Sequence, residues 1–362
     1  MPHIRRLARK PSTAFAALLL HGRDATAFTH ALPLATGRAA FEIGLRALGV
    51  RPGARVLLPE YICDVMLVPF QRLNLRPLYY ELDDHLSPDW ESLEKMLPSA
   101  EAAVLLHPFG QPQDSVRFGT CCGQQGVLFV EDNAHGWGAE RDGQPLGTFG
   151  DMGFASPWKQ YAIPHGAFLY LRPDAAFDEA LRLCTALSAR WVRYVAPFFK
   201  SRLRALLTLT PQLRLRYMRP TYLPEVAAAS VPEQPQKMSP SVAGWLAQQR
   251  PAADAARRRA VYRIWETWTS AAGLRPVFPA LHAGAAPLCF PAYAPDCGSR
   301  DDWLRWGWLH DMAVHTWPTL PENLRVLSRI MDRWNRLVCF PIHQEVDSHE
   351  LSHLLHSLTP PC

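Results

Sequence analysis

Lysine is scarce in this chain of 362 residues. Only Lys10, Lys95, Lys159, Lys200 and Lys237 occur, and the remaining basic side chains are arginines. Chemistry that needs a lysine amine therefore has few candidates. The formal net charge of +5 is small for this length, so it does not indicate a nucleic-acid partner, and we expect none.

The sequence also lacks paired cysteines, long apolar runs, repeats and low-complexity tracts. Its eight cysteines are scattered and form no CxxC pair, which is typical of a reducing cytosol and not of a disulfide framework. No apolar run approaches the roughly 20 residues that a membrane helix needs. The apolar stretch at 14–20 is short and no convincing cleavage site follows it, so we expect a cytoplasmic protein.

Short apolar runs alternate with amphipathic stretches between residues 35 and 172. Continuous apolar runs are typical of strands buried on both faces, and helices between such strands are typical of a parallel sheet. The sequence therefore predicts an α/β fold with a mainly parallel sheet flanked by helices. Strands are expected at 56–59, 77–82, 102–106 and 127–132, and helices at 39–49, 62–73 and 89–97.

Two domains fit this length and a hydrophobic content of 48%. We expect a large α/β domain over 1–240 and a small C-terminal α+β domain over 241–362, which begins with one long helix over 241–272. The segment 186–224 has eight basic residues, no acid and many aromatics. It is either a solvated helical pair that packs its aromatics on the main domain, or a patch that faces phosphate groups or a membrane surface.

Three local features are candidates for chemistry. Asp132 ends an apolar run, which predicts a carboxylate at the ligand-binding edge of the sheet, or alternatively a cap for the next turn. Lys159 lies among aromatic residues and prolines, where burial depresses the pKa and makes the amine a nucleophile; a structural lysine is the alternative. Thr36-Gly37-Arg38 opens a predicted helix, whose N–H groups can bind an anion.

The segment His349-Glu350-Leu351-Ser352-His353 matches HExxH, which on a helix directs two imidazoles toward one zinc ion. Zinc enzymes with this motif need a third ligand, and His356 follows too closely for the usual spacings. We therefore interpret the motif as a surface face of histidines and expect no metal site.

Several motifs occur in an order that resembles a known family. The main ones are the helix start at Thr36, the segment Glu131-Asp132-Asn133-Ala134-His135, and Ser156-Pro157-Trp158-Lys159. Supporting motifs are Leu48-Gly49-Val50-Arg51-Pro52-Gly53, His107-Pro108-Phe109-Gly110-Gln111-Pro112, Arg257-Arg258-Arg259 and Phe340-Pro341-Ile342-His343. From about residue 36 to 355, the chain resembles the DegT/StrS family of sugar aminotransferases that depend on pyridoxal phosphate (PLP).

The resemblance implies a fold-type I PLP transferase with a seven-stranded-type sheet. Lys159 would hold the cofactor covalently and move the proton during the reaction. Asp132 would pair with the pyridine nitrogen, and His135 would lie by the phenolic oxygen or the face of the ring. The family forms homodimers with the active site at the subunit interface, so a homodimer is implied as well.

The phosphate and the ring would be held by further residues. The resemblance implies that the phosphate lies at the helix start, and that Cys63 or Tyr61 covers the ring. The implied phosphate-binding residues are Thr36, Gly37, Arg38 and Ser156.

The chain departs from the family at three places. Arg38 stands where the family has a hydroxyl, and Pro235 stands where it has an asparagine that reaches the partner's phosphate. The motif around Lys159 lacks the family's Gly-Glu-Gly-Gly. These changes leave the cofactor expected and weaken the case for a standard nucleotide-sugar substrate.

The implied reaction is amino transfer, from glutamate, to a keto sugar. The sugar would be nucleotide-linked and used for polysaccharide, lipopolysaccharide or secondary-metabolite biosynthesis. One alternative is a PLP enzyme of another reaction type on a non-sugar substrate, although Lys159 argues against the dehydratase branch, which has histidine there. The other is a catalytically silent binding or scaffold protein that uses 186–224 as its contact surface, including a peripheral membrane contact.

Overall fold

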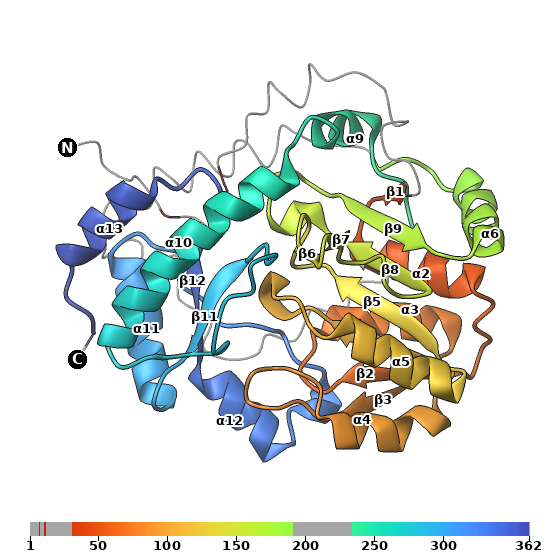
Figure 1. The fold of residues 1–362 in the computed structure, drawn as a ribbon, viewed down its shortest axis with the longest axis horizontal. Coiled ribbons are helices and arrows are strands. Elements are labelled where there is room, and N and C mark those ends of the chain that lie inside the picture. The colour runs from red at the N-terminus through yellow and green to blue at the C-terminus, as the bar shows by residue number, and fades with distance from the viewer. Residues whose placement is uncertain (1–6, 8–10, 12–30, 191–233, 362) are drawn as a thin grey trace.

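A computed structural model of the chain describes residues 7, 11, 31–190 and 234–361 (Figure 1). The apolar stretch at 14–20 lies outside the described residues. The basic segment 186–224 also lies outside them from position 191 onward, so its two interpretations stay predictions.

A seven-stranded sheet lies at the centre of the first half of the chain. Its strands are β1 (Ala31–Leu34), β2 (Arg55–Pro59), β3 (Arg76–Tyr80), β4 (Ala102–Leu106), β5 (Leu128–Asn133), β8 (Met152–Ala155) and β9 (Ala167–Leu171). They lie in the order β1-β9-β8-β5-β4-β2-β3. Neighbours from β8 to β3 pair in parallel, whereas β9 is antiparallel to both β8 and β1. The predicted mainly parallel sheet is confirmed.

Helices cover both faces of this sheet (Figure 1). On one face α2 (Gly37–Ala47) contacts β8 and β9, together with α3 (Val68–Leu73) and α6 (Asp174–Thr185). On the other face lie α4 (Trp90–Met96) and α5 (Ser115–Gln125). In the described ranges of the chain, no helix combines the length and the hydrophobicity that crossing a membrane requires.

The prediction of one helix over 62–73 is wrong in its first half. Asp64–Leu67 forms a 3₁₀ turn, η2, and the α-helix begins only at Val68. Pro69 lies in the first turn of α3, where its missing N–H is not needed, so it favours a new helix start at this point.

The second half of the chain builds a smaller antiparallel sheet. Its strands are β10 (Arg275–Pro276), β11 (Cys289–Tyr293) and β12 (Leu337–Pro341). One face packs through Phe290 and Phe340 against α10 (Pro251–Ala271), α11 (Cys297–Leu309) and α13 (Ser348–His356). Cys289 and Cys339 point to the opposite face and join the core of the large sheet. The remaining elements include the hairpin β6 (Glu140–Arg141) and β7 (Gln144–Pro145), and α12 (Ser328–Arg336).

The prediction of one long helix over 241–272 is also wrong. The structure has α9 (Pro240–Leu246) and then α10, which begins at Pro251. Proline has no N–H to continue a helix, but it fits the first turn of a new one, so the chain breaks before Pro251. The domain boundary at residue 240 stays a prediction.

Candidate active site

Asp132 lies near the carboxyl end of β5, at the predicted edge of the sheet. Its side chain is buried, and Oδ1 accepts a hydrogen bond from the Ala134 N–H at 2.8 Å. This is the turn contact that was the alternative role, but it uses only one oxygen. The other oxygen has no hydrogen-bond partner in the described part of the chain. Burial raises the pKa of Asp132, and the charge of Lys159 is the largest effect that opposes this.

Lys159 ends η5 (Pro157–Lys159), the short 3₁₀ turn that follows β8. Its ammonium makes no hydrogen bond or ion pair with any residue that the structure describes, but it interacts electrostatically with Asp132 and Cys63. Burial lowers the pKa of Lys159, and these two neighbours offset part of the shift. An amine with a lowered pKa is a better nucleophile and proton acceptor near neutral pH than an exposed lysine.

His135 is buried with one ring nitrogen already engaged. Its Nδ1 accepts a hydrogen bond from the Phe109 N–H at 3.1 Å, so in the neutral ring the proton is on Nε2. Burial, with the charge of Lys159 second, holds the pKa of His135 well below its usual range. His135 is therefore neutral at physiological pH and offers an N–H donor.

His135 contacts the rings of two aromatic residues that were not predicted for the site. The Phe109 ring stacks on it at 5.9 Å between centroids, and the Trp317 ring meets it edge-on at 4.8 Å. The Tyr61 hydroxyl donates to the Trp317 carbonyl at 2.8 Å, whereas Cys63 interacts with Lys159. Cys63 and Tyr61 were the two residues predicted to cover the cofactor ring. Of these, Cys63 lies near Lys159, whereas Tyr61 is directed toward Trp317.

The start of α2 lies against Ser156, as the anion-site prediction requires. A Cβ on Gly37 would come within 2.7 Å of Ser156 Oγ, so only glycine leaves room between the helix and this hydroxyl. Thr36 caps the helix by accepting the Ala39 N–H at 3.2 Å. Thr36 and Arg38 also line a small pocket together with Arg190 and residues 234–236.

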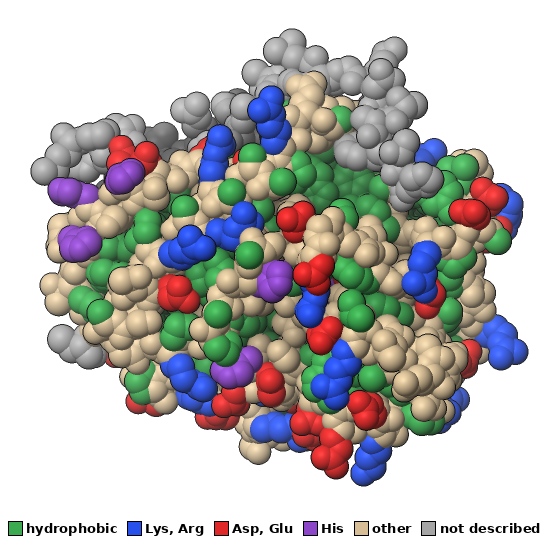
Figure 2. All heavy atoms as spheres, viewed as in Figure 1, with side chains coloured by type: hydrophobic (Ala, Val, Ile, Leu, Met, Phe, Trp, Pro, Cys, Tyr) green, Lys and Arg blue, Asp and Glu red, His purple; other side chains and the backbone are tan. Residues whose placement is uncertain are grey.

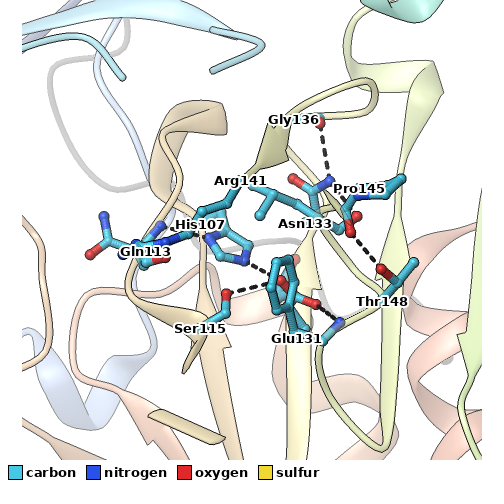
Figure 3. A network of polar contacts seen from close by, with 12 residues as sticks. His107, Gln113, Ser115, Glu131, Asn133, Gly136, Arg141, Pro145 and Thr148 are labelled. Carbon is cyan, nitrogen blue, oxygen red and sulfur yellow. Dashed lines mark hydrogen bonds and ion pairs between the residues drawn. The ribbon is translucent and has the colours of Figure 1, made fainter. Parts of the chain in front are cut away.

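Glu131 is the centre of a buried polar network beneath the site (Figure 3). Its Oε1 accepts from His107 Nε2 at 2.8 Å and from Ser115 Oγ at 3.2 Å, and its Oε2 accepts from the Phe149 N–H at 2.8 Å. His107 Nδ1 accepts from the Gln113 N–H at 3.0 Å, which fixes the ring with its proton toward Glu131. The network ties the ends of β4 and β5 together and so positions Asp132.

Replacing Glu131 with glutamine is expected to lower the free energy of unfolding by about 3 kcal/mol, because an amide NH₂ would face a donor and the charge-assisted contacts would be lost. Urea unfolding of the purified variant measures this. Glu140→Gln is the control, since Glu140 is exposed. Equal stability of both variants would mean that the network does not stabilise the edge.

Arg258 connects Lys159's turn to the small sheet. It is buried and donates to the Gln160 carbonyl at 2.6 Å, to the Ile342 carbonyl at 3.2 Å and to Gln344 Oε1 at 2.8 Å. Burial lowers the pKa of Arg258 to about 10, so it remains charged at neutral pH. Arg258 thereby fastens the segment that carries the lysine to a helix 98 positions away and, through Ile342 and Gln344, to the end of β12.

The HExxH motif lies apart from this site. His349, Glu350 and His353 are exposed on α13, and Figure 2 shows histidine side chains on the surface at the position of that helix in Figure 1. The predicted surface face of histidines is confirmed.

The donor set fits PLP. In the described ranges the Lys159 amine has no hydrogen bond or ion pair, so it can react with the aldehyde of PLP. The buried Asp132 carboxylate has one oxygen without a hydrogen bond there, which can bind the pyridine nitrogen of PLP. The helix N-terminus at Gly37 and the Ser156 hydroxyl, which lie close together, suit a phosphate.

Comparison with known proteins identifies the family. The profile of the DegT/DnrJ/EryC1/StrS aminotransferase family matches residues 23–203, half of the chain. This chain belongs to that family. PLP, the expected cofactor, is thereby supported, and one similar solved structure, a putative sugar aminotransferase from Streptococcus pneumoniae, is a PLP form.

Two similar proteins each match less than half of this chain. An L-glutamine:2-deoxy-scyllo-inosose aminotransferase from Streptomyces kanamyceticus is 29% identical over 38% of this chain and 33% of its own length. A UDP-N-acetyl-3-dehydro-alpha-D-glucosamine 3-aminotransferase from Acidithiobacillus ferrooxidans is 27% identical over 42% of each chain. The matches thus span well under half of these relatives.

Solved structures extend the likeness of the fold to most of the chain. Helicobacter pylori PseC, an aminotransferase, has a TM-score of 0.69 at 11% identity and covers 96% of this chain and 95% of its own. The aminotransferase TlmJ from Streptoalloteichus hindustanus has a TM-score of 0.67 at 20% identity and covers 90% and 84%. The predicted fold class, the family's α/β transferase fold, is confirmed.

Proposed function

We propose that this chain is a PLP-dependent aminotransferase that transfers an amino group, from glutamate, to a keto sugar, most simply one linked to a nucleotide. The observation that carries the proposal is the Lys159 amine with a lowered pKa, beside the buried Asp132 carboxylate. The names of the relatives support the substrate class, since they include aminotransferases of a keto cyclitol and of a UDP-linked keto sugar.

Lys159 and Asp132 would divide the central chemistry. PLP, when bound, supplies an electron sink for the carbon that carries the amino group. Asp132 would use its second oxygen to hold a proton on the ring nitrogen. Lys159 Nζ would take the proton from the substrate carbon and return it, which its lowered pKa favours.

The other residues would hold and orient the cofactor. Neutral His135, fixed by the Phe109 N–H, would present its Nε2 proton to the ring or its phenolic oxygen. Gly37 and Ser156 would bind the phosphate through N–H and hydroxyl groups, with Thr36 maintaining the helix start and Arg38 adding charge. Cys63 would lie against the ring near Lys159.

The half-reactions test this proposal. Protein loaded with PLP is expected to convert glutamate to 2-oxoglutarate in a single turnover, with a change in the near-visible spectrum. A nucleotide-linked keto sugar is then expected to restore the spectrum and yield an amino sugar. Restoration by non-sugar keto compounds alone would indicate another substrate class. Bound PLP without either half-reaction would favour a catalytically silent protein.

Gly37→Ala is expected to weaken PLP binding about 10- to 100-fold, the loss of roughly one charge-assisted hydrogen bond or more. The added Cβ would press on Ser156 Oγ where the phosphate binds. Gly123→Ala is the matched control, because that helical glycine has no atom within 4 Å of the added carbon. Fluorescence titration with PLP measures both, and equal affinities would place the phosphate elsewhere.

Two further properties are part of the proposal. We infer a homodimer, which the family resemblance supports, and a cytoplasmic location, which the seven described cysteines support because none is in a disulfide. Sedimentation of the purified chain tests the first.

A further inference from the structure

Three potential metal ligands lie in a row across the small sheet. His315 pairs with Cys339 of β12 through both backbone hydrogen bonds, His315 N–H to Cys339 at 3.0 Å and the reverse at 2.7 Å. On the other side of β12, the register pairs Cys289 with Pro341 and Pro291 with Cys339. Cys289 and Cys339 are therefore diagonal neighbours on one face, and His315 is directly opposite Cys339.

The ligand atoms of these side chains converge. The sulfurs of Cys289 and Cys339 and one ring nitrogen of His315 lie within 4.8 Å of one another. We propose that Cys289, His315 and Cys339 bind a thiophilic divalent cation of the Zn²⁺ type, with the fourth position taken by an exogenous ligand. Two thiolates and one imidazole are donors that zinc prefers, and metal–ligand bonds of about 2.0–2.3 Å suit such a group.

A metal ion suits this geometry better than a disulfide. A disulfide needs Cβ atoms about 3.5–4.5 Å apart, whereas diagonal positions on antiparallel strands are separated by about 7 Å. An ion between the sulfurs removes the need for such a close approach. Both cysteines are buried and neither is in a disulfide.

The surroundings of His315 supply one further feature of a metal site. His315 Nδ1 lies 3.1 Å from the Ala313 carbonyl, and a metal-bound histidine usually directs its second ring nitrogen to such an acceptor.

The proposed site has a direct connection to the cofactor pocket. Trp317, two residues after His315, contacts both His135 and Tyr61 with its ring. An ion that joins His315 to the two strands would hold this segment against β12 and keep Trp317 in place. The ion's role would be to position the pocket and not to react, so the site does not depend on the proposed aminotransferase activity.

The proposal is tested by titrating cobalt into the full-length, reduced protein after a chelator has removed bound metal. One Co²⁺ per chain is expected, with intense bands in the red, where PLP does not absorb, and a thiolate charge-transfer band. Cys289→Ser and Cys339→Ser are each expected to remove the charge-transfer intensity in part and to weaken binding more than ~100-fold, above the loss typical of outer-shell changes.

Three other variants separate binding from folding and from other sites. His315→Ala removes a partly exposed side chain, so it is expected to fold and still lose affinity. Cys297→Ser and His353→Ala, both at exposed positions, are expected to bind Co²⁺ as the wild type does. Absence of thiolate-bound Co²⁺ in the wild type, unchanged binding by His315→Ala, or loss in His353→Ala would overturn the proposal.

Discussion

Lys159→Ala is expected to abolish the near-visible absorption that the wild-type protein gains with PLP and to lower turnover at least ~10⁴-fold. The variant loses both the covalent attachment of the cofactor and the proton carrier. The loss of turnover should be nearly complete, because no second lysine is among the groups that shift the pKa of Lys159 and could take over the role of its amine. Absorption spectra with and without PLP, followed by glutamate turnover, measure the two effects.

The control for this prediction is Lys95→Ala, an exposed lysine in α4. Lys95→Ala should retain the spectrum and the turnover of the wild type. Retention of the PLP band by Lys159→Ala would show that the cofactor is attached elsewhere. Absence of the band in the folded wild type would indicate that the family's chemistry has been lost from this chain.

The positions in the fold that the sequence predicted correctly follow from the order of residues in short segments. An apolar run that ends in acid indicates a buried strand with a carboxylate at its end, and the structure places Asp132 there. The sequence likewise shows a glycine at a helix start beside a hydroxyl, but it does not show that Gly37 lies so close to Ser156 that an added Cβ would be 2.7 Å from its Oγ. Parallel neighbours bring strand ends together whatever the loops between them contain.

The parts that could not be predicted depend on contacts between distant segments. Trp317 reaches His135 across 182 positions, and no spacing rule connects an isolated tryptophan with a cofactor pocket. Cys289, His315 and Cys339 likewise come from three separate segments, so their convergence depends on strand register and not on a motif. The HExxH motif shows the reverse, since its spacing is suggestive but its side chains are exposed.

The prediction of one continuous helix across Pro251 is a different kind of error. The predicted helix over 241–272 includes 247–250, a mainly polar segment of good helix formers, and continues through Pro251. Backbone chemistry decides here, because proline lacks the N–H that a continuing helix would use.

Asp132→Asn is expected to leave PLP attached to Lys159 but to lower turnover about 10³-fold, since an amide cannot hold a proton on the ring nitrogen. The substitution conserves shape and the contact with the Ala134 N–H, so the fold should persist. Asp151→Asn is the matched control. Asp151 lies beside the first residue of β8, at the opposite edge of the sheet, and accepts the Phe129 N–H at 2.8 Å.

The same variant makes a prediction about pH. The negative charge of Asp132 raises the pKa of Lys159 against the effect of burial. Removing this charge should lower the pKa of Lys159 further, so the amine becomes neutral at a lower pH than in the wild type. The pH at which the protein captures PLP should therefore shift downward in Asp132→Asn and stay unchanged in Asp151→Asn. An upward shift, or equal shifts in both variants, would show that Asp132 does not act on the lysine, and its assignment to the cofactor would fail with it.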